Sequence, residues 1–363
     1  MLIAASRNLQ AWLPQMQVLD ATQYRAHLNH PPAASDPLLC VSDLTVNFRL
    51  DQARESAVLR QVNFAIAPGK IIGLLGESGC GKTTTALSIL RLLAPAARTV
   101  SGSIQFRGND LLQVKERRLR EIRGAEISIV YQDSNVLNQV MRVGDQVMEV
   151  LRAHKPAPCA RMRAEILELF AAIGLDDHER IYRAYPHQLS GGQRRRIVIA
   201  QALICQPQLV IADEPTAGLD SETSAGILQL VTRLRDLYGT AFLLITHDPE
   251  ALAAVADDVL VMYTGQIVES GPVREVFSRP LHPYTHALLQ CGSHAFTAEK
   301  VPGRRIVLPC IPGYAPDPSE SLSGCSFAGR CSDRMAICDS KQPVLFEISA
   351  AQSARCFKHE VEA

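Results

Sequence analysis

The sequence predicts an α/β fold organised around a phosphate-binding loop. Residues 71–75 form an apolar run that predicts a buried strand, and the glycine-rich stretch 76–83 follows it directly. Residues 84–93 then carry apolar side chains at the spacing of a helix that packs against a sheet. Apolar runs at 209–213 and 241–245 predict two more short strands, and each leads into charged or polar residues. Strand, glycine loop and helix in this order are the context that a phosphate-binding loop requires.

Length and composition limit the class of protein. The 363 residues suffice for a large domain with a smaller one, and 47% hydrophobic with 20% charged residues is typical of a globular chain. The formal net charge is zero, which gives no electrostatic reason to expect nucleic acid as a partner. No apolar run reaches the roughly eighteen residues of a membrane-spanning helix. Residues 1–37 lack a signal-peptide pattern and predict a flexible extension.

Each fixed position of the glycine-rich stretch has a physical role. Gly76, Gly79 and Gly81 permit backbone conformations in which successive N–H groups turn inward. Together with the helix N-terminus, these groups would cradle a polyphosphate. Lys82 can reach the β- and γ-phosphates, and the Thr83 hydroxyl can bind Mg²⁺. The predicted nucleotide-binding residues of this stretch are Gly76, Glu77, Ser78, Gly79, Cys80, Gly81, Lys82, Thr83 and Thr84.

Polar residues at the ends of predicted strands supply candidates for catalysis. Asp213 is placed to hold Mg²⁺, and Glu214, which points elsewhere, can polarise a water for in-line attack. Gln132 can contact Mg²⁺ or that water, and His247 can hydrogen-bond a γ-phosphate oxygen. Taken singly, Gln132 favours a solvated role and His247 a structural one. Phe48 offers a flat ring on which adenine could stack, with packing in the core as the alternative.

A second candidate anion site lies at residues 189–193. Ser190 suits the N-cap of the helix that follows, and Gly191 and Gly192 leave the start of that helix bare. A bare helix N-terminus binds anions. The three arginines at 194–196 are expected to form a solvated face.

The order of these motifs resembles the ATP-binding subunits of ATP-binding cassette (ABC) transporters. The resemblance runs from about Leu38 to the C-terminus and rests on residues 76–83, Gln132, 189–193, 209–214, 218–220 and His247. It implies that two such subunits bind head to tail and enclose two ATP molecules, each with Mg²⁺. Phe48 would stack on adenine, and Asp220 would communicate across the dimer. The residues implied to complete the site on the partner chain are Ser190, Gly191, Gly192 and Gln193.

The C-terminal part is similar to the extension of the oligopeptide/dipeptide/nickel importer subfamily. Residues 281–285 and 311–313 carry this resemblance. The spacing of Cys325, Cys331, Cys338 and Cys356 resembles the iron–sulfur motif of that subfamily, which binds a 4Fe–4S cluster. Four thiolates on short loops could instead hold Zn²⁺ or remain free thiols, and spacing alone does not separate these possibilities.

The expected fold is therefore an α/β P-loop ATPase core with an antiparallel β subdomain and a helical subdomain, followed by a small Cys-rich region. The core should span residues 38–280, with the helical subdomain at about 133–188, and the C-terminal extension 281–363. The expected function is ATP hydrolysis that powers uptake of peptides, or of a related solute such as nickel or a metallophore. The chain would be peripheral at the cytoplasmic face of the inner membrane.

The implied partners are a second ATPase subunit, two transmembrane permease subunits and, indirectly, an extracytoplasmic solute-binding protein. The second cassette could be a sister subunit or an identical chain. A soluble ABC ATPase acting on ribosomes or nucleic acid is one alternative, but a single cassette without sustained heptads argues against it. A regulatory, non-hydrolytic cassette is another, and the complete set of Lys82, Asp213, Glu214 and His247 argues against it. Residues 133–139 depart from the subfamily pattern.

Overall fold

The computed structural model describes residues 36–49, 55–132, 136–291, 310–317, 320, 323–349 and 351–360. The chain from Pro37 onward forms one compact unit. The predicted extension at 1–37 lies almost wholly outside the described residues. Within the described ranges, no helix has both the length and the apolar character needed to cross a membrane.

The larger of two sheets carries the phosphate loop. Its strands are β3 (Ile71–Leu75), β6 (Ile127–Val130), β7 (Leu209–Asp213), β8 (Ala241–Thr246), β9 (Asp258–Tyr263), β10 (Gln266–Pro272), β11 (Phe346–Glu347) and β12 (Ser353–Ala354). Their order is β11-β12-β10-β9-β3-β8-β7-β6, and the strands from β9 to β6 run parallel. Every residue of β3, β7 and β8 is buried, which is why these strands are continuous apolar runs rather than alternating ones.

The smaller sheet is antiparallel, as predicted for a β subdomain. It comprises β1 (Leu39–Arg49), β2 (Glu55–Ile66), β4 (Ala97–Phe106) and β5 (Asn109–Asp110) in the order β2-β1-β4-β5. Burial alternates along parts of β1 and β2, as it does in a sheet with one face on the core. The sheet therefore has one apolar face to cover.

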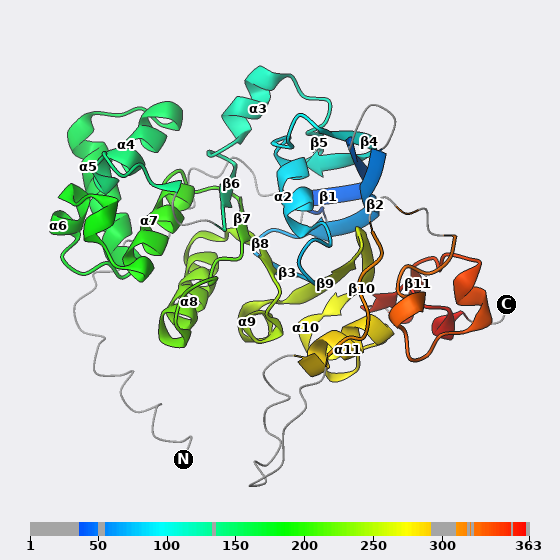
Figure 1. The fold of residues 1–363 in the computed structure, drawn as a ribbon. Helices are drawn as coiled ribbons and strands as arrows, with labels where there is room; N and C mark the ends of the chain where they lie inside the picture. Colours follow the sequence, from blue (N-terminus) through cyan, green and yellow to red (C-terminus); the bar gives the residue numbers. More distant parts are fainter. Residues whose placement is uncertain are drawn as a thin grey trace, which may run out of the picture. The chain divides into compact units, whose positions relative to one another are not determined.

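Ten helices are described, and they fall into groups along the chain. They are α2 (Lys82–Ile89), α3 (Glu116–Ile122), α4 (Val143–His154), α5 (Cys159–Ala172), α6 (His178–Arg183), α7 (Gly191–Leu203), α8 (Ser221–Tyr238), α9 (Pro249–Val255), α10 (Val273–Ser278) and α11 (Pro283–Cys291). Helices α4 to α7 contact one another and form a green group beside β6 (Figure 1). This group contains the predicted helical subdomain.

Two apolar cores hold these layers together. The smaller core joins the antiparallel sheet, α2 and one face of the parallel strands, through residues such as Val46, Ala86 and Leu243. The larger core joins the other face to the helices of the α4–α9 region, through residues such as Phe170 and Leu230. Helix α2 is thus packed on both sheets, and its N-terminus is fixed at the end of β3.

The Cys-rich C-terminal region is attached to the ATPase core. Strand β12 pairs with β10, and β11 pairs with β12, so the end of the chain extends the larger sheet. Phe327, which is 2% exposed, belongs to the larger core. Figure 1 shows this orange and red region next to α11.

The predicted bounds of the first helix need correction. The sequence predicts a helix over 84–93, but α2 ends at Ile89. Arg91 has a φ of +50°, which an α-helix cannot continue through. The Arg91 side chain instead bonds the carbonyl oxygens of Leu111 and Val114. Apolar spacing in 90–93 therefore reflects packing of a loop.

Candidate nucleotide-binding and hydrolysis site

The phosphate loop connects β3 to α2, and close packing dictates two of its glycines. A Cβ on Gly76 would lie 2.3 Å from the carbonyl oxygen of Met262. Gly81 has a φ of +110°, and a Cβ there would lie 2.8 Å from the side chain of Leu59. Another residue at Gly76 would displace the Met262 backbone, and at Gly81 the positive φ and the Leu59 side chain disfavour any other residue. Glycine is therefore favoured at these two positions of the motif.

Lys82 lies buried at the start of α2 and folds over the loop. Its Nζ donates to the carbonyl oxygens of Gly76 at 2.7 Å and Glu77 at 2.9 Å. An ammonium group at a helix N-terminus, surrounded by loop N–H groups, is suited to binding phosphate oxygens. Burial raises the pKa of the nearby Cys80 thiol, which keeps that loop residue neutral.

Thr83 and Asp213 meet across the sheet. The Thr83 hydroxyl donates to Asp213 Oδ2 at 2.7 Å, which joins the start of α2 to the end of β7. Burial raises the pKa of the Asp213 carboxyl, and the Thr83 hydrogen bond opposes that rise. A buried carboxylate and a hydroxyl are the oxygen ligands that Mg²⁺ prefers, so this pair fits the ion. Mg²⁺ held there would neutralise charge on bound phosphates.

Glu214 turns away from Asp213 toward the end of β8. Its φ of +47° is unusual for a residue with a side chain and marks local strain. Oε1 of Glu214 accepts from the backbone N–H of His247 at 3.1 Å and lies 2.7 Å from His247 Nδ1. Oε2 accepts from the Thr246 hydroxyl at 3.2 Å. Glu214 and His247, two of the catalytic candidates of the sequence, are therefore in direct contact.

Arg195 corrects the prediction of a solvated arginine run. It is 3% exposed, and its guanidinium donates to the carbonyl oxygens of Tyr131 at 2.7 Å and Pro215 at 2.8 Å. It also donates to the Glu214 carbonyl at 2.9 Å. Burial lowers the pKa of Arg195. Arg195 therefore links the end of β6 to the turn after β7. These bonds hold the backbone that carries the Asp213 and Glu214 carboxylates.

The predicted second anion site lies at the start of α7. Ser190 is its N-cap: Ser190 Oγ accepts from the Gln193 N–H at 3.2 Å, and Gln193 Oε1 accepts from the Ser190 N–H at 3.0 Å. The hollow beside these residues is lined by α7, α8 and the 174–176 segment. No residue of the chain's own phosphate loop lines it.

Three further predicted residues are spread along the chain. Gln132 is exposed just after β6, and Arg195 Nη1 approaches its carbonyl oxygen at 3.5 Å. Phe48 is half-buried near the end of β1 and packs on the smaller core. Asp220 is the N-cap of α8, and bonds from Thr223 lower the pKa of its carboxyl. Their roles stay predictions.

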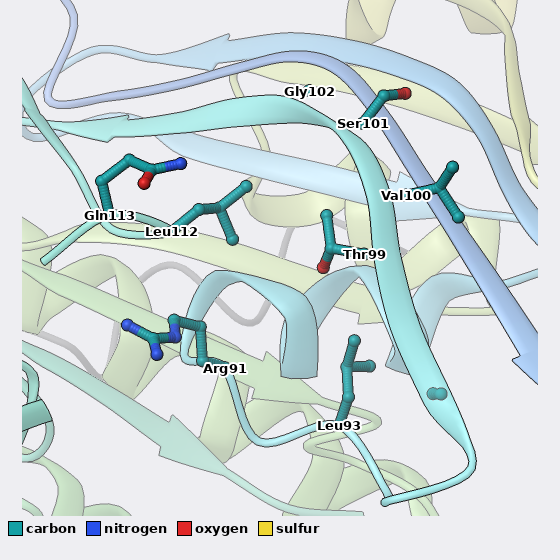
Figure 2. Close-up of a pocket in the computed structure, with 9 residues that line it drawn as sticks. Arg91, Leu93, Thr99, Val100, Ser101, Gly102, Leu112 and Gln113 are labelled. Atoms are coloured by element: carbon teal, nitrogen blue, oxygen red, sulfur yellow. The ribbon is translucent and has the colours of Figure 1, made fainter.

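A separate hollow lies beyond the other end of α2 (Figure 2). It is formed by the segment after α2, by β4 and by the residues after β5, and its lining includes Arg91, Leu93, Thr99, Leu112 and Gln113. None of the predicted site residues lines it. The predicted nucleotide-binding residues lie at the opposite end of α2.

The four C-terminal cysteines converge. Cys325, Cys331, Cys338 and Cys356 line one enclosed cavity together with aromatic and aliphatic side chains. Burial raises the pKa of Cys325 to about 11 and also raises those of Cys331 and Cys356. Across the described ranges, no group of three or more His, Cys, Asp or Glu side chains is arranged to hold a metal ion.

The fold and the site together define a P-loop nucleoside triphosphatase core, because the glycine loop, the Thr83–Asp213 pair and the Glu214–His247 pair meet at one edge of a parallel sheet. Comparison with known proteins narrows the class. The family model described as "ABC transporter" matches residues 59–217, and that described as "Oligopeptide/dipeptide transporter, C-terminal region" matches residues 268–338.

Relatives and solved structures agree with these matches. The "Probable peptide ABC transporter ATP-binding protein y4tR" of Sinorhizobium fredii is 43% identical over 326 residues, which cover 89% of this chain and 96% of that protein. A Brucella abortus protein, provisionally named as a peptide import ATP-binding protein, is 41% identical over 321 residues (88% and 94%). The chain belongs to the ABC transporter ATP-binding proteins, and it is an ATPase of that family.

Solved cassettes share the fold. The dimeric bacterial ABC transporter cassette MJ0796 aligns with a TM-score of 0.58 at 26% identity, covering 65% of this chain and 99% of the cassette. The cbiO1 subunit from Clostridium perfringens, part of the ABC transporter complex cbiONQ, aligns with the same TM-score at 27% identity, covering 67% and 92%. The alignment covers about two thirds of the chain.

Sequence reasoning missed three residues that support the site. Arg195 was recoverable, because it lies three and four residues before Val198 and Ile199 and so shares their buried face of α7. Tyr284 and Arg330 had no such signal. Both contact Glu77 of the phosphate loop, from which they are more than 200 residues away in the sequence.

Proposed function

We propose that this chain hydrolyses ATP to power uptake of peptides through separate membrane subunits, working peripherally at the cytoplasmic face. The observation that carries the proposal is the junction of Thr83 with Asp213 and of Glu214 with His247, at the ends of neighbouring parallel strands. The peptide assignment is supported by the match to the oligopeptide/dipeptide C-terminal region and by the names of the relatives.

In the proposed mechanism, the phosphates of ATP lie in the glycine loop and Lys82 exchanges its carbonyl partners for phosphate oxygens. Thr83 and Asp213 would hold Mg²⁺. Glu214 polarises the attacking water, and His247 holds the γ-phosphate and orients the Glu214 side chain. Gln132 would contact the metal or the water, and Phe48 would stack on the adenine.

A second cassette completes the site in this proposal. Ser190, Gly191, Gly192 and Gln193 would bind the γ-phosphate held by a partner subunit, and Asp220 would contact that subunit nearby. The hollow at the start of α7, which lacks any residue of the chain's own loop, supports this arrangement. The dimeric state of the MJ0796 cassette supports it as well. The second cassette would be a sister subunit or a second copy of this chain.

The C-terminal cysteines would hold a 4Fe–4S cluster. The support is the convergence of Cys325, Cys331, Cys338 and Cys356 on one cavity, because thiolates are the ligands of such clusters. A cluster would stabilise the thiolate forms of these residues and cross-link their loops. The chain's own contribution is the enclosure by apolar side chains such as Phe327 and Met335.

The Glu214→Gln variant tests the mechanism. It removes the base but keeps the shape: the amide oxygen can accept from His247, and the amide nitrogen would donate to the Thr246 hydroxyl, so we expect normal ATP binding and at least a hundredfold loss of turnover. ATP hydrolysis in the assembled transporter and equilibrium ATP binding are the measurements. Glu347→Gln, on an exposed residue of β11, is the matched control. Full turnover by Glu214→Gln would remove Glu214 from its proposed role.

A further inference from the structure

One side chain of the phosphate loop is bound by the C-terminal region rather than by the ATPase core. Arg330 donates from Nη1 to Oε2 of Glu77 at 2.8 Å and from Nη2 to Oε1 at 3.0 Å. The Arg330 side chain is 7% exposed and that of Glu77 is 31% exposed. A two-pronged pair of this kind is among the stronger polar contacts in proteins, and its geometry restricts both side chains.

Arg330 is itself held from three directions. Its Nε donates to the carbonyl oxygen of Pro312 at 2.9 Å, and Nη1 lies 3.4 Å from the Tyr263 hydroxyl. Its guanidinium also lies 5.8 Å from the centre of the Tyr263 ring. The bonds to Glu77 raise the pKa of Arg330, so its charge is permanent. Arg330 can therefore act as a fixed anchor for the loop.

The backbone of Glu77 is held by the same region. Its N–H donates to the hydroxyl of Tyr284 at 2.9 Å, and Tyr284 is fully buried. The Tyr284 ring packs on Tyr263 at 4.5 Å and on Phe327 at 5.5 Å between ring centres. Phe327 lies three residues before Arg330. One short segment therefore contacts the Glu77 side chain through Arg330, and through Phe327 it packs on Tyr284, which bonds the Glu77 backbone.

The contact reaches the group that binds phosphate. Lys82 Nζ donates to the carbonyl oxygen of Glu77, so the position of Glu77 helps to fix Lys82. Charge matters too. A free Glu77 carboxylate would repel the phosphates of a nucleotide in the loop, and the paired guanidinium cancels that repulsion.

We propose that Arg330 is a positioning residue of the nucleotide site: it neutralises Glu77 and fixes the phosphate loop in its binding conformation. The Cys-rich segment thereby contributes to ATP affinity from outside the ATPase core. The proposal rests on ATP binding at residues 76–83. It assigns Arg330 no part in hydrolysis itself, because Glu214 and His247 lie on other loops.

Equilibrium ATP binding by full-length variants tests this role. We expect Arg330→Gln to raise the Kd for ATP roughly tenfold, because the Glu77 charge is left unpaired. Glu77→Gln alone should weaken ATP binding less than Arg330→Gln does, because it removes the charge that Arg330 neutralises. The double variant Glu77→Gln/Arg330→Gln should recover most of the affinity lost in Arg330→Gln. The KM for ATP should follow the Kd, while kcat at saturating ATP should change less than about twofold.

The controls separate this role from a purely structural one. Arg334→Gln breaks an exposed ion pair with Asp339 in the same segment and should leave the Kd unchanged. Arg330→Lys keeps the charge and should give an intermediate Kd, which also serves if Arg330→Gln does not fold. A double variant that binds as weakly as Arg330→Gln, or an unchanged Kd in Arg330→Gln, overturns the proposal. Lys82→Ala must abolish binding; if it does not, the nucleotide site itself is misassigned.

Discussion

Some side chains at this site stabilise it by bonding backbone groups rather than by facing the substrate. Arg195 is the main example, because one buried guanidinium bonds carbonyl oxygens on both sides of the two carboxylates. The Glu214 carbonyl also accepts from the Ala217 N–H at 3.2 Å, and buried carbonyl groups are costly when they lose hydrogen bonds. Arg195 is therefore a structural support for Asp213 and Glu214.

Arg195→Met should destabilise the fold strongly. The apolar stem is kept, but the carbonyl oxygens of Tyr131, Glu214 and Pro215 each lose a charged hydrogen-bond donor, so we expect a loss of roughly 3 kcal/mol in the free energy of unfolding. Arg194→Met is the matched control, since the half-buried Arg194 side chain bonds the Leu189 carbonyl, and it should cost about 1 kcal/mol. Urea unfolding of both variants gives the comparison. Equal urea midpoints for the two variants would show that the Arg195 bonds stabilise the fold no more than the single Arg194 bond does.

At the scale of elements, apolar periodicity predicted most of the core well. Strands β3, β7 and β8 were placed within a residue or so, because a fully buried parallel strand is a continuous apolar run. The end of α2 was not predicted, since the turn at Arg91 depends on its bonds to Leu111 and Val114. The contacts of Arg330 and Tyr284 with Glu77 were not predictable either. No local pattern marks two residues that meet only after the chain has folded.

The C-terminal segment contains elements too small to fold on their own. Strands β11 and β12 have two residues each, and the rest of the segment contains short turns around the cysteines. They pack on the ATPase core through the β12–β10 pairing and Phe327, and a metal or cluster would add a further cross-link between their loops. This argument, and the shared cavity of the cysteines, motivates the cluster proposal.

Iron and labile sulfide should therefore accompany the anaerobically purified chain. We expect about four of each per chain, as a 4Fe–4S cluster requires. Cys325→Ser should lose both and make the C-terminal segment more sensitive to protease, whereas Cys159→Ser, on the exposed surface of α5, should change neither. Elemental analysis with limited proteolysis is the measurement. One zinc per chain, or no metal at all, would contradict the cluster.

At the scale of the whole molecule, the two parts of the proposed nucleotide site lie on separate elements. The loop, Asp213, Glu214 and His247 gather at one edge of the parallel sheet. Ser190, Gly192 and Gln193, at the start of α7, line a different hollow. In the proposed dimer, each part completes a site with the opposite part of a second cassette. Hydrolysis should then depend on α7, while ATP binding by one chain should not.

The most direct test is the Gly191→Glu variant. Gly191 is exposed, and an added Cβ would meet its nearest neighbour, a side-chain atom of Leu219, at 3.9 Å, so the variant should fold. A carboxylate there would repel a γ-phosphate presented by a second cassette. We predict an unchanged Kd for ATP in the single chain and at least a hundredfold loss of hydrolysis in the assembled transporter, with Ala164→Glu on α5 as the charge control. Wild-type hydrolysis by Gly191→Glu would contradict the shared nucleotide site.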